Sequence, residues 1–155
     1  MGNMESLGCN WGEFNSDNIL AITLLRVFCD KSYFAVNRIN TFSEKSVLES
    51  YNILIGDFKE SCGLKNIIFN EPGSNARNVW RYIKDKKNIE NRLVELLVMF
   101  CFNKHNRLIS LDMFHIIELI DNMNDSDIYS NEQEAAFKRA LTTMENILLS
   151  LKEEA

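Results

Sequence analysis

The sequence has 155 residues, 46% of them hydrophobic and 25% charged, which is the composition of an ordinary globular protein. A chain of this length is most economically a single helical domain, spanning 1–155, with a hydrophobic core of its own. The net charge of −5 argues against nucleic-acid binding, because contact with phosphates needs a dominant positive field.

Charge is segregated along the sequence. Residues 1–76 hold six Lys/Arg and nine Asp/Glu, residues 77–107 hold eight and three, and residues 108–155 hold three and ten. The net charges of the three segments are therefore −3, +5 and −7. Segregation of this kind bears on the choice of partner and on the rate of association rather than on the fold.

The first part of the chain is expected to contain an irregular start followed by a buried helix. Residues 1–16 are expected to form an irregular N-terminal segment. Residues 17–30 are almost entirely apolar, which predicts a central helix that is buried on most sides. Residues 31–40 fit either a continuation of that helix or a loop.

A second helix is predicted from the capping box that Thr41 and Glu44 form. Apolar residues keep helical spacing behind this box, so the helix is expected to end near residue 62. A short extended piece over 64–69 and a proline-containing turn are expected to follow.

Serine and asparagine residues mark the starts of the remaining helices. Ser74 is expected to cap a short helix, Asn88 the next one and Ser110 a third. Ser130 and Gln133 form a second capping box, which opens the longest helix. Together these patterns predict an all-α fold, a single compact irregular bundle of about six helices.

The chain has four cysteines and no C-x-x-C pair: Cys9, Cys29, Cys62 and Cys101. Buried, reduced thiols are the simplest interpretation, and they indicate a reducing compartment. No apolar run reaches the length of a membrane span and the first residues lack a secretory signal, so a cytoplasmic protein is expected. Residues 1–6 fit the loose N-myristoylation pattern, which leaves acylation of Gly2 open as a membrane anchor.

Catalytic chemistry has few candidates, since the chain holds only two histidines. One cluster has the right residue types for acid–base work, at helical spacing: Asp112, His115 and Glu118. A charged helix surface explains it better, because no nucleophile or metal-ligand motif accompanies it. Phosphate-binding loops and His/Cys metal spacings are absent as well. We therefore expect no enzyme activity and no cofactor or metal.

The segment from Asp121 to Glu132 resembles an EF-hand calcium loop over twelve residues. Acidic residues occupy positions 1, 5, 7 and 12 of such a loop: Asp121, Asp125, Asp127 and Glu132. However, Met123 replaces the oxygen ligand at position 3 and Ser126 replaces the glycine needed at position 6. The preferred interpretation is an acidic loop between two helices.

The basic segment places Arg77, Arg81 and Lys84 on one helical face. A nucleic-acid patch has this appearance. The acidity of the whole chain favours a solvated face of an amphipathic helix instead, with the acidic third of the same molecule or of a second copy as its ionic partner.

A helical domain without catalytic residues and with one acidic face is best suited to binding another protein. The chain is small and acidic, and it is rich in Asn, Ile and Lys, which AT-rich genes encode. In these respects it resembles the small acidic immunity proteins of bacterial contact-dependent growth inhibition and related toxin systems. That resemblance implies a stoichiometric complex with one cognate toxin domain, for which a nuclease with a basic surface is the natural candidate. No nucleic acid is expected as a partner, and no membrane unless Gly2 is acylated.

The expected contact residues lie in the acidic loop and at the start of the helix that follows: Asp121, Asp125, Asp127, Glu132 and Glu134, with Asn122, Asn124 and Tyr129 as hydrogen-bonding contacts. A different class of protein remains as the alternative, namely a viral helical bundle that binds a helix of a host protein. Such a bundle uses an apolar groove rather than an acidic face.

Overall fold

The computed structural model describes residues 6–10, 14–29, 35–40, 42–56, 64–67, 74–102 and 111–154. Gly2, Thr41, Cys62 and Ser110 lie outside these ranges. In chain order the elements are β1 (Ser6–Asn10), α1 (Ser16–Phe28), β2 (Ala35–Ile39), α2 (Lys45–Glu49), β3 (Ile53–Ile55), α3 (Asn75–Lys87), α4 (Arg92–Phe102), α5 (Leu111–Asp121) and α6 (Asn131–Glu154).

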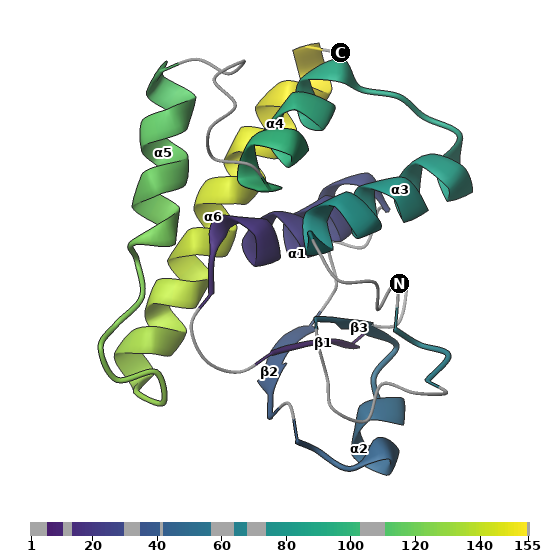
Figure 1. Cartoon of the computed structure of the whole chain (residues 1–155), viewed down its shortest axis with the longest axis vertical. Helices are drawn as coiled ribbons and strands as arrows, with labels where there is room; N and C mark the ends of the chain where they lie inside the picture. The colour runs from purple at the N-terminus through teal and green to yellow at the C-terminus, as the bar shows by residue number, and fades with distance from the viewer. Residues whose placement is uncertain are drawn as a thin grey trace.

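The fold is mostly helical, with a small three-stranded sheet at one end (Figure 1). The described part of the chain contains six helices, as predicted, but the sheet makes the all-α prediction wrong in that respect. None of the described helices is long and apolar enough to cross a membrane.

The sheet is parallel, with the strand order β2-β1-β3. Its central strand, β1, lies within the segment 1–16 that was predicted to be irregular. On β1, Leu7 and Cys9 point to the face that α1 covers, while Gly8 faces the second side, where α2 lies (Figure 1). This alternation is the two-residue period of a strand.

Two further predictions fail in the sheet region. Residues 35–39 form β2, which is neither the helix nor the loop that was considered. Within the described residues of the helix predicted from 41 to 62, only the five-residue α2 is helical, and its N-cap is Glu44. Ile53 and Ile55, which continue the helical spacing in the sequence, belong to β3 instead and pack against the main core.

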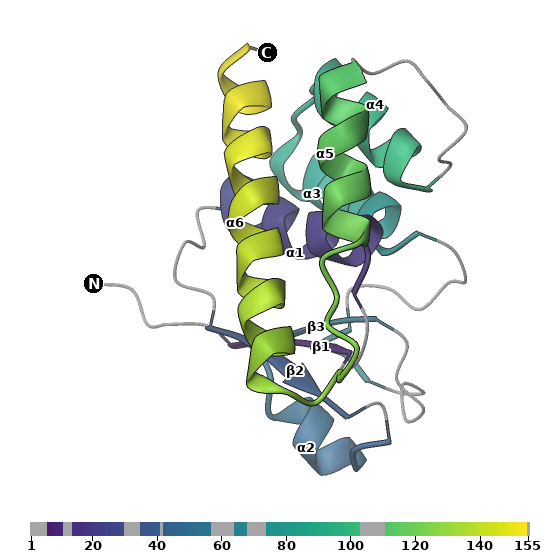
Figure 2. The same ribbon diagram turned by 90° about the vertical axis from the view of Figure 1, so that its left-hand side faces the viewer.

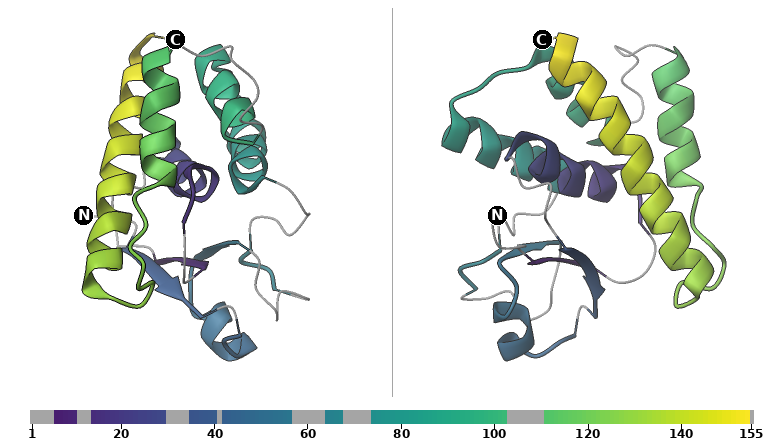
Figure 3. Two further views of the ribbon diagram at one scale, coloured as in Figure 1. Left: turned by 60° about the vertical axis from the view of Figure 1, so that its left-hand side comes forward. Right: turned by 180° about the vertical axis from the view of Figure 1, so that it is seen from behind.

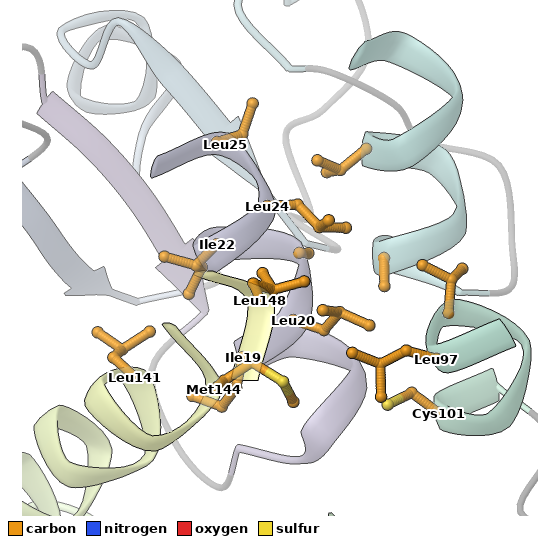
Figure 4. Packing of buried hydrophobic residues seen from close by; sticks show 14 of the residues in the cluster. Ile19, Leu20, Ile22, Leu24, Leu25, Leu97, Cys101, Leu141, Met144 and Leu148 are labelled. Atoms are coloured by element: carbon orange, nitrogen blue, oxygen red, sulfur yellow. The ribbon is translucent and has the colours of Figure 1, made fainter. Parts of the chain in front are cut away.

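The main hydrophobic core surrounds α1, which is buried on most sides as predicted. The long helix α6 crosses over it (Figure 3), while α3 and α4 pack against other sides. Figure 4 shows Ile19 close to Met144 of α6, and Leu20 directed toward Leu97 of α4. α1 therefore lies between the sheet and the other large helices.

The ends of α3 show which capping predictions are correct. Ser74 caps α3 by accepting the N–H of Arg77 at 3.0 Å, as predicted. Asn88 ends α3 instead of starting the next helix: its φ of 51° is left-handed, as is common at a helix C-terminus. The side chain of Asn91 accepts the N–H of Val94 at 3.1 Å and so caps α4.

Candidate protein-binding site

The expected contact residues lie in the segment that joins α5 to α6, which we call the acidic junction (residues 121–134). In Figure 2 the junction connects the lower ends of the two helices, and Figure 1 shows the helices diverging from it. The N–H of Gln133 donates to Ser130 Oγ at 3.0 Å, which confirms Ser130 as the cap of α6. In a complete capping box the Gln133 side chain would accept the Ser130 N–H. Here that N–H donates to the carbonyl of Asp127 at 3.1 Å, and the Gln133 side chain is bonded within the loop.

The side chain of Gln133 is fully buried beneath the junction and holds its backbone. Its Oε1 accepts the N–H of Asp125 at 2.6 Å, and its Nε2 donates to Asn124 Oδ1 at 2.7 Å. Buried amides need partners for both groups, and these two bonds satisfy both. The loop is therefore folded back over the first turn of α6.

Asn124 and Asp121 connect the junction to the start of α1. Asn124 accepts the N–H of Phe14 at 2.9 Å and donates to the Phe14 carbonyl at 2.7 Å. Asp121 Oδ1 accepts the N–H of Ser16 at 2.6 Å, which places a carboxylate at the N-terminus of α1. Both side chains are half-buried and bonded to the start of α1, so they stabilise the fold and are not part of an exposed surface.

Glu134 connects α6 to the sheet. Its Oε2 lies 2.9 Å from Nε of Arg38 on β2, whose side chain is only 5% exposed. The guanidinium of Arg38 also lies over the ring of Phe137, 5.5 Å from its centroid. Glu134 is therefore a structural partner of a buried arginine. The sequence does not indicate this role, because residues 31–40 fit a helix continuation or a loop, and not the strand that positions Arg38.

Four side chains of the predicted set are exposed, Asn122 among them. We call the other three, which lie later in the junction, the exposed edge: Asp127, Tyr129 and Glu132. Tyr129 is 71% exposed, the highest value among the large apolar or aromatic side chains of the described residues. Asp127 Oδ1 accepts the N–H of Tyr129 at 3.1 Å, which fixes the turn that carries the tyrosine.

The last two predicted contacts, Asp125 and Asn122, shape the junction. The carboxylate of Asp125 accepts the N–H of Asp127 at 3.0 Å, so Asp125 forms the first part of the same turn. Asn122 is exposed, and its amide donates to the carbonyl of Glu118 at 2.9 Å. The eight predicted residues thus lie in one segment, but only four of them are exposed: Asn122 and the three residues of the exposed edge.

Cys9 lies on the central strand near the Arg38–Glu134 pair. Its thiol donates to the carbonyl of Asn37 at 3.6 Å. Burial raises the pKa of Cys9 to about 12, while the charge of Arg38 lowers it and that of Glu134 raises it to a smaller extent. The thiol is therefore protonated at neutral pH and serves as a small apolar side chain.

We expect Cys9 to resist alkylation at pH 8, because the thiolate is the reactive form. Iodoacetamide labelling followed by peptide mass spectrometry should modify the half-buried Cys29 before Cys9. Since the folded pKa exceeds the ordinary value of 9.0, the Cys9 contribution to stability is intact below pH 9 and is lost as the pH rises toward about 12. Equal labelling rates of Cys9 and Cys29 would contradict the burial of Cys9.

The remaining candidate residues are separate from the junction. His115 and Glu118 are exposed on α5, while the side chain of Asp112 lies outside the described part. On α3, Lys84 pairs with Glu95 of α4 at 2.7 Å rather than with a residue of the acidic third. Within the described ranges, no group of three His, Cys, Asp or Glu side chains could hold a metal ion.

The junction can offer a partner an exposed tyrosine between two carboxylates, on a backbone held by internal hydrogen bonds. No protein-family model matches the chain, and no curated protein or solved structure matches it significantly.

Proposed function

We propose that this chain is a non-catalytic protein-binding module that neutralises a basic toxin domain, in the manner of an immunity protein. The observation that carries the proposal is the exposed edge, where Tyr129 is 71% exposed between the exposed residues Asp127 and Glu132. Tyrosine is enriched among the residues that dominate binding energy, because it buries a large area with few rotatable bonds. The two carboxylates add a preference for a basic partner.

The hydrogen bonds beneath the edge support this function. Gln133 holds the backbone of Asp125, and Asp127 holds that of Tyr129. A loop already fixed in its binding conformation loses less conformational entropy when the complex forms. The exposed edge is thus suited to tight, stoichiometric binding in which its backbone conformation changes little.

The charge distribution favours a basic partner over an acidic one. Residues 108–155 hold ten Asp/Glu against three Lys/Arg, and the junction carries five of those acidic groups. Opposite charges steer two proteins together and raise the association rate. A nuclease domain, whose active site must attract phosphates, presents such a basic surface.

The apolar-groove alternative has less support. Large exposed apolar side chains of the described residues are spread over separate parts of the molecule: Phe42 before α2, Val47 on α2, Met99 on α4, Leu119 on α5 and Leu149 on α6. A helix-binding groove needs such residues in one continuous surface. This distribution favours the exposed edge.

The binding prediction concerns the exposed edge. The chain is used as bait in an extract of its native cells, and the recovered partner is then purified. The double variant Asp127→Lys/Glu132→Lys is expected to slow association with this partner about tenfold and to flatten its salt dependence, because rim charges act mainly on the association rate. Tyr129→Ala should raise the dissociation rate about tenfold or more. Asp125 is left unchanged, because its carboxylate supports the turn.

A matched control is the double variant Glu90→Lys/Glu153→Lys, which changes the net charge equally at two exposed positions outside the junction. If both double variants slow association equally, only the overall charge matters and the edge is not the site. Toxin neutralisation is tested by expressing the partner with and without the chain. A partner whose toxicity or enzyme activity is unchanged in a one-to-one complex would overturn the immunity function.

A further inference from the structure

The second face of the sheet has a small hydrophobic cluster of its own. Among the described residues, its buried members are Ile39, Leu48, Leu54 and Leu64, with Tyr51 and Ile67 packed against them. None of these residues belongs to the core around α1, because the sheet lies between the two clusters. The α2 side can therefore lose its packing without disturbing the larger core.

Asn66 joins the pieces that cover this face. Its Nδ2 donates to the carbonyls of Leu48 and Tyr51, both at 2.8 Å, and so holds the C-terminal end of α2. Its backbone carbonyl accepts the N–H of Leu54 at 3.0 Å, on the outer edge of β3. One residue thus connects α2, the turn after it and the strand.

The same residue also carries an unfavourable feature. Oδ1 of Asn66 is buried and has no hydrogen-bond partner within the part of the chain that the structure describes. A buried acceptor without a partner is penalised relative to the same group in water. Opening of this region would hydrate Oδ1, which offsets part of the loss of the two Nδ2 bonds.

The helix that Asn66 holds is weakly supported by other contacts. α2 has five residues, and its N-cap Glu44 makes no side-chain capping bond. Phe42 and Val47 are 70% and 45% exposed, so they contribute little to the packing beneath α2. Helices this short depend on tertiary contacts, which here are chiefly Leu48 and the bonds from Asn66.

We propose that residues 42–52 and 64–67 form a cap that opens as one unit from the second face of the sheet, with Asn66 as its latch. β3 remains paired with β1 in the open state, because Ile53 and Ile55 pack in the larger core. Opening uncovers Ile39 and Leu54 and frees the N–H of Leu54. Segments with few buried apolar contacts are those that open below the global unfolding transition.

Native-state hydrogen exchange, read by NMR in increasing low concentrations of denaturant, tests the proposal. Leu54 donates to Asn66, whereas its neighbour Ile55, paired with Cys9, directs its N–H toward β1. In the wild type the Leu54 amide should exchange at least tenfold faster than Ile55, with a smaller denaturant dependence. Equal rates with equal denaturant dependence would mean that the cap opens only with the whole protein, which overturns the proposal without needing any variant.

The variant Asn66→Ala is expected to speed exchange at Leu54 by roughly tenfold to a hundredfold and to leave Ile55 unchanged. The matched control is the exposed neighbour in Lys65→Ala, for which neither amide should change. If Asn66→Ala accelerates Leu54 and Ile55 equally, Asn66 supports the global fold and is not a latch.

Discussion

Replacing Gly8 with valine is expected to destabilise the folded state by about 3 kcal/mol, because the site has no room for a side chain. A Cβ atom at this position would lie 2.8 Å from Cδ2 of Leu54 and 3.0 Å from Cδ1 of Ile39. Both side chains are buried and both belong to the cluster under α2, so neither can move without disturbing the other. Urea unfolding followed by circular dichroism measures the loss.

A double-mutant cycle shows whether the contact with Leu54 is the cause. Leu54→Ala alone should be destabilising, since it leaves a cavity in a small cluster. In the Gly8→Val background the same change should cost about 1–2 kcal/mol less, because the valine then has space. Strict additivity of the two changes would exclude steric conflict between residues 8 and 54. Gly8→Ala should lie between the wild type and Gly8→Val.

The strands could not be predicted from the sequence, for a physical reason. β3 is a short apolar run, which local periodicity does not distinguish from a helix segment, whereas β1 and β2 are five-residue segments that mix apolar and polar residues. Their pairing is also distant in the chain, since Leu7 of β1 is aligned with Val36 of β2 and Ile53 of β3. Nothing near Ile53 in the sequence indicates that pairing, and the helical spacing of apolar residues continues through it.

The helices were predicted more successfully, because their signals are local. α1, α3 and α6 each span at least three turns, and two of them begin at the predicted cap residues, Ser74 and Ser130. Capping depends on bonds between residues three positions apart, which the sequence contains directly. Asn88 is the exception, because asparagine also suits the left-handed end of a helix.

The candidate site was predicted in place but not in detail. The sequence indicated correctly that the acidic residues lie between two helices. It could not indicate that Asp121, Asn124 and Glu134 are bonded to Ser16, Phe14 and Arg38, which lie 96 to 110 positions away in the chain. A carboxylate or amide in a sequence carries no sign of its tertiary partner, so structural and exposed members of the junction look alike.

Asn124→Ala tests the structural half of the junction and is expected to destabilise the protein by about 2–4 kcal/mol. The change removes two bonds to the backbone of Phe14, one to Gln133 and a longer one, 3.5 Å, to the carbonyl of Asp121. Phe14 is 5% exposed and Gln133 is fully buried, so the groups left behind are poorly placed to bond to water instead. Differential scanning calorimetry should show the loss as a lower melting temperature, with the heat of unfolding still that of a folded domain.

The neighbouring asparagine provides the control for this prediction. Asn122→Ala removes one bond, to the carbonyl of Glu118, at an exposed position, and should change stability by less than about 1 kcal/mol. Asn124→Asp keeps the acceptor for Phe14 N–H but loses the donor, so its melting temperature should lie between those of the wild type and Asn124→Ala. Equal effects of the two alanine variants would mean that Asn124 is merely another surface residue. In that case the exposed edge would not have the fixed backbone on which its proposed binding function depends.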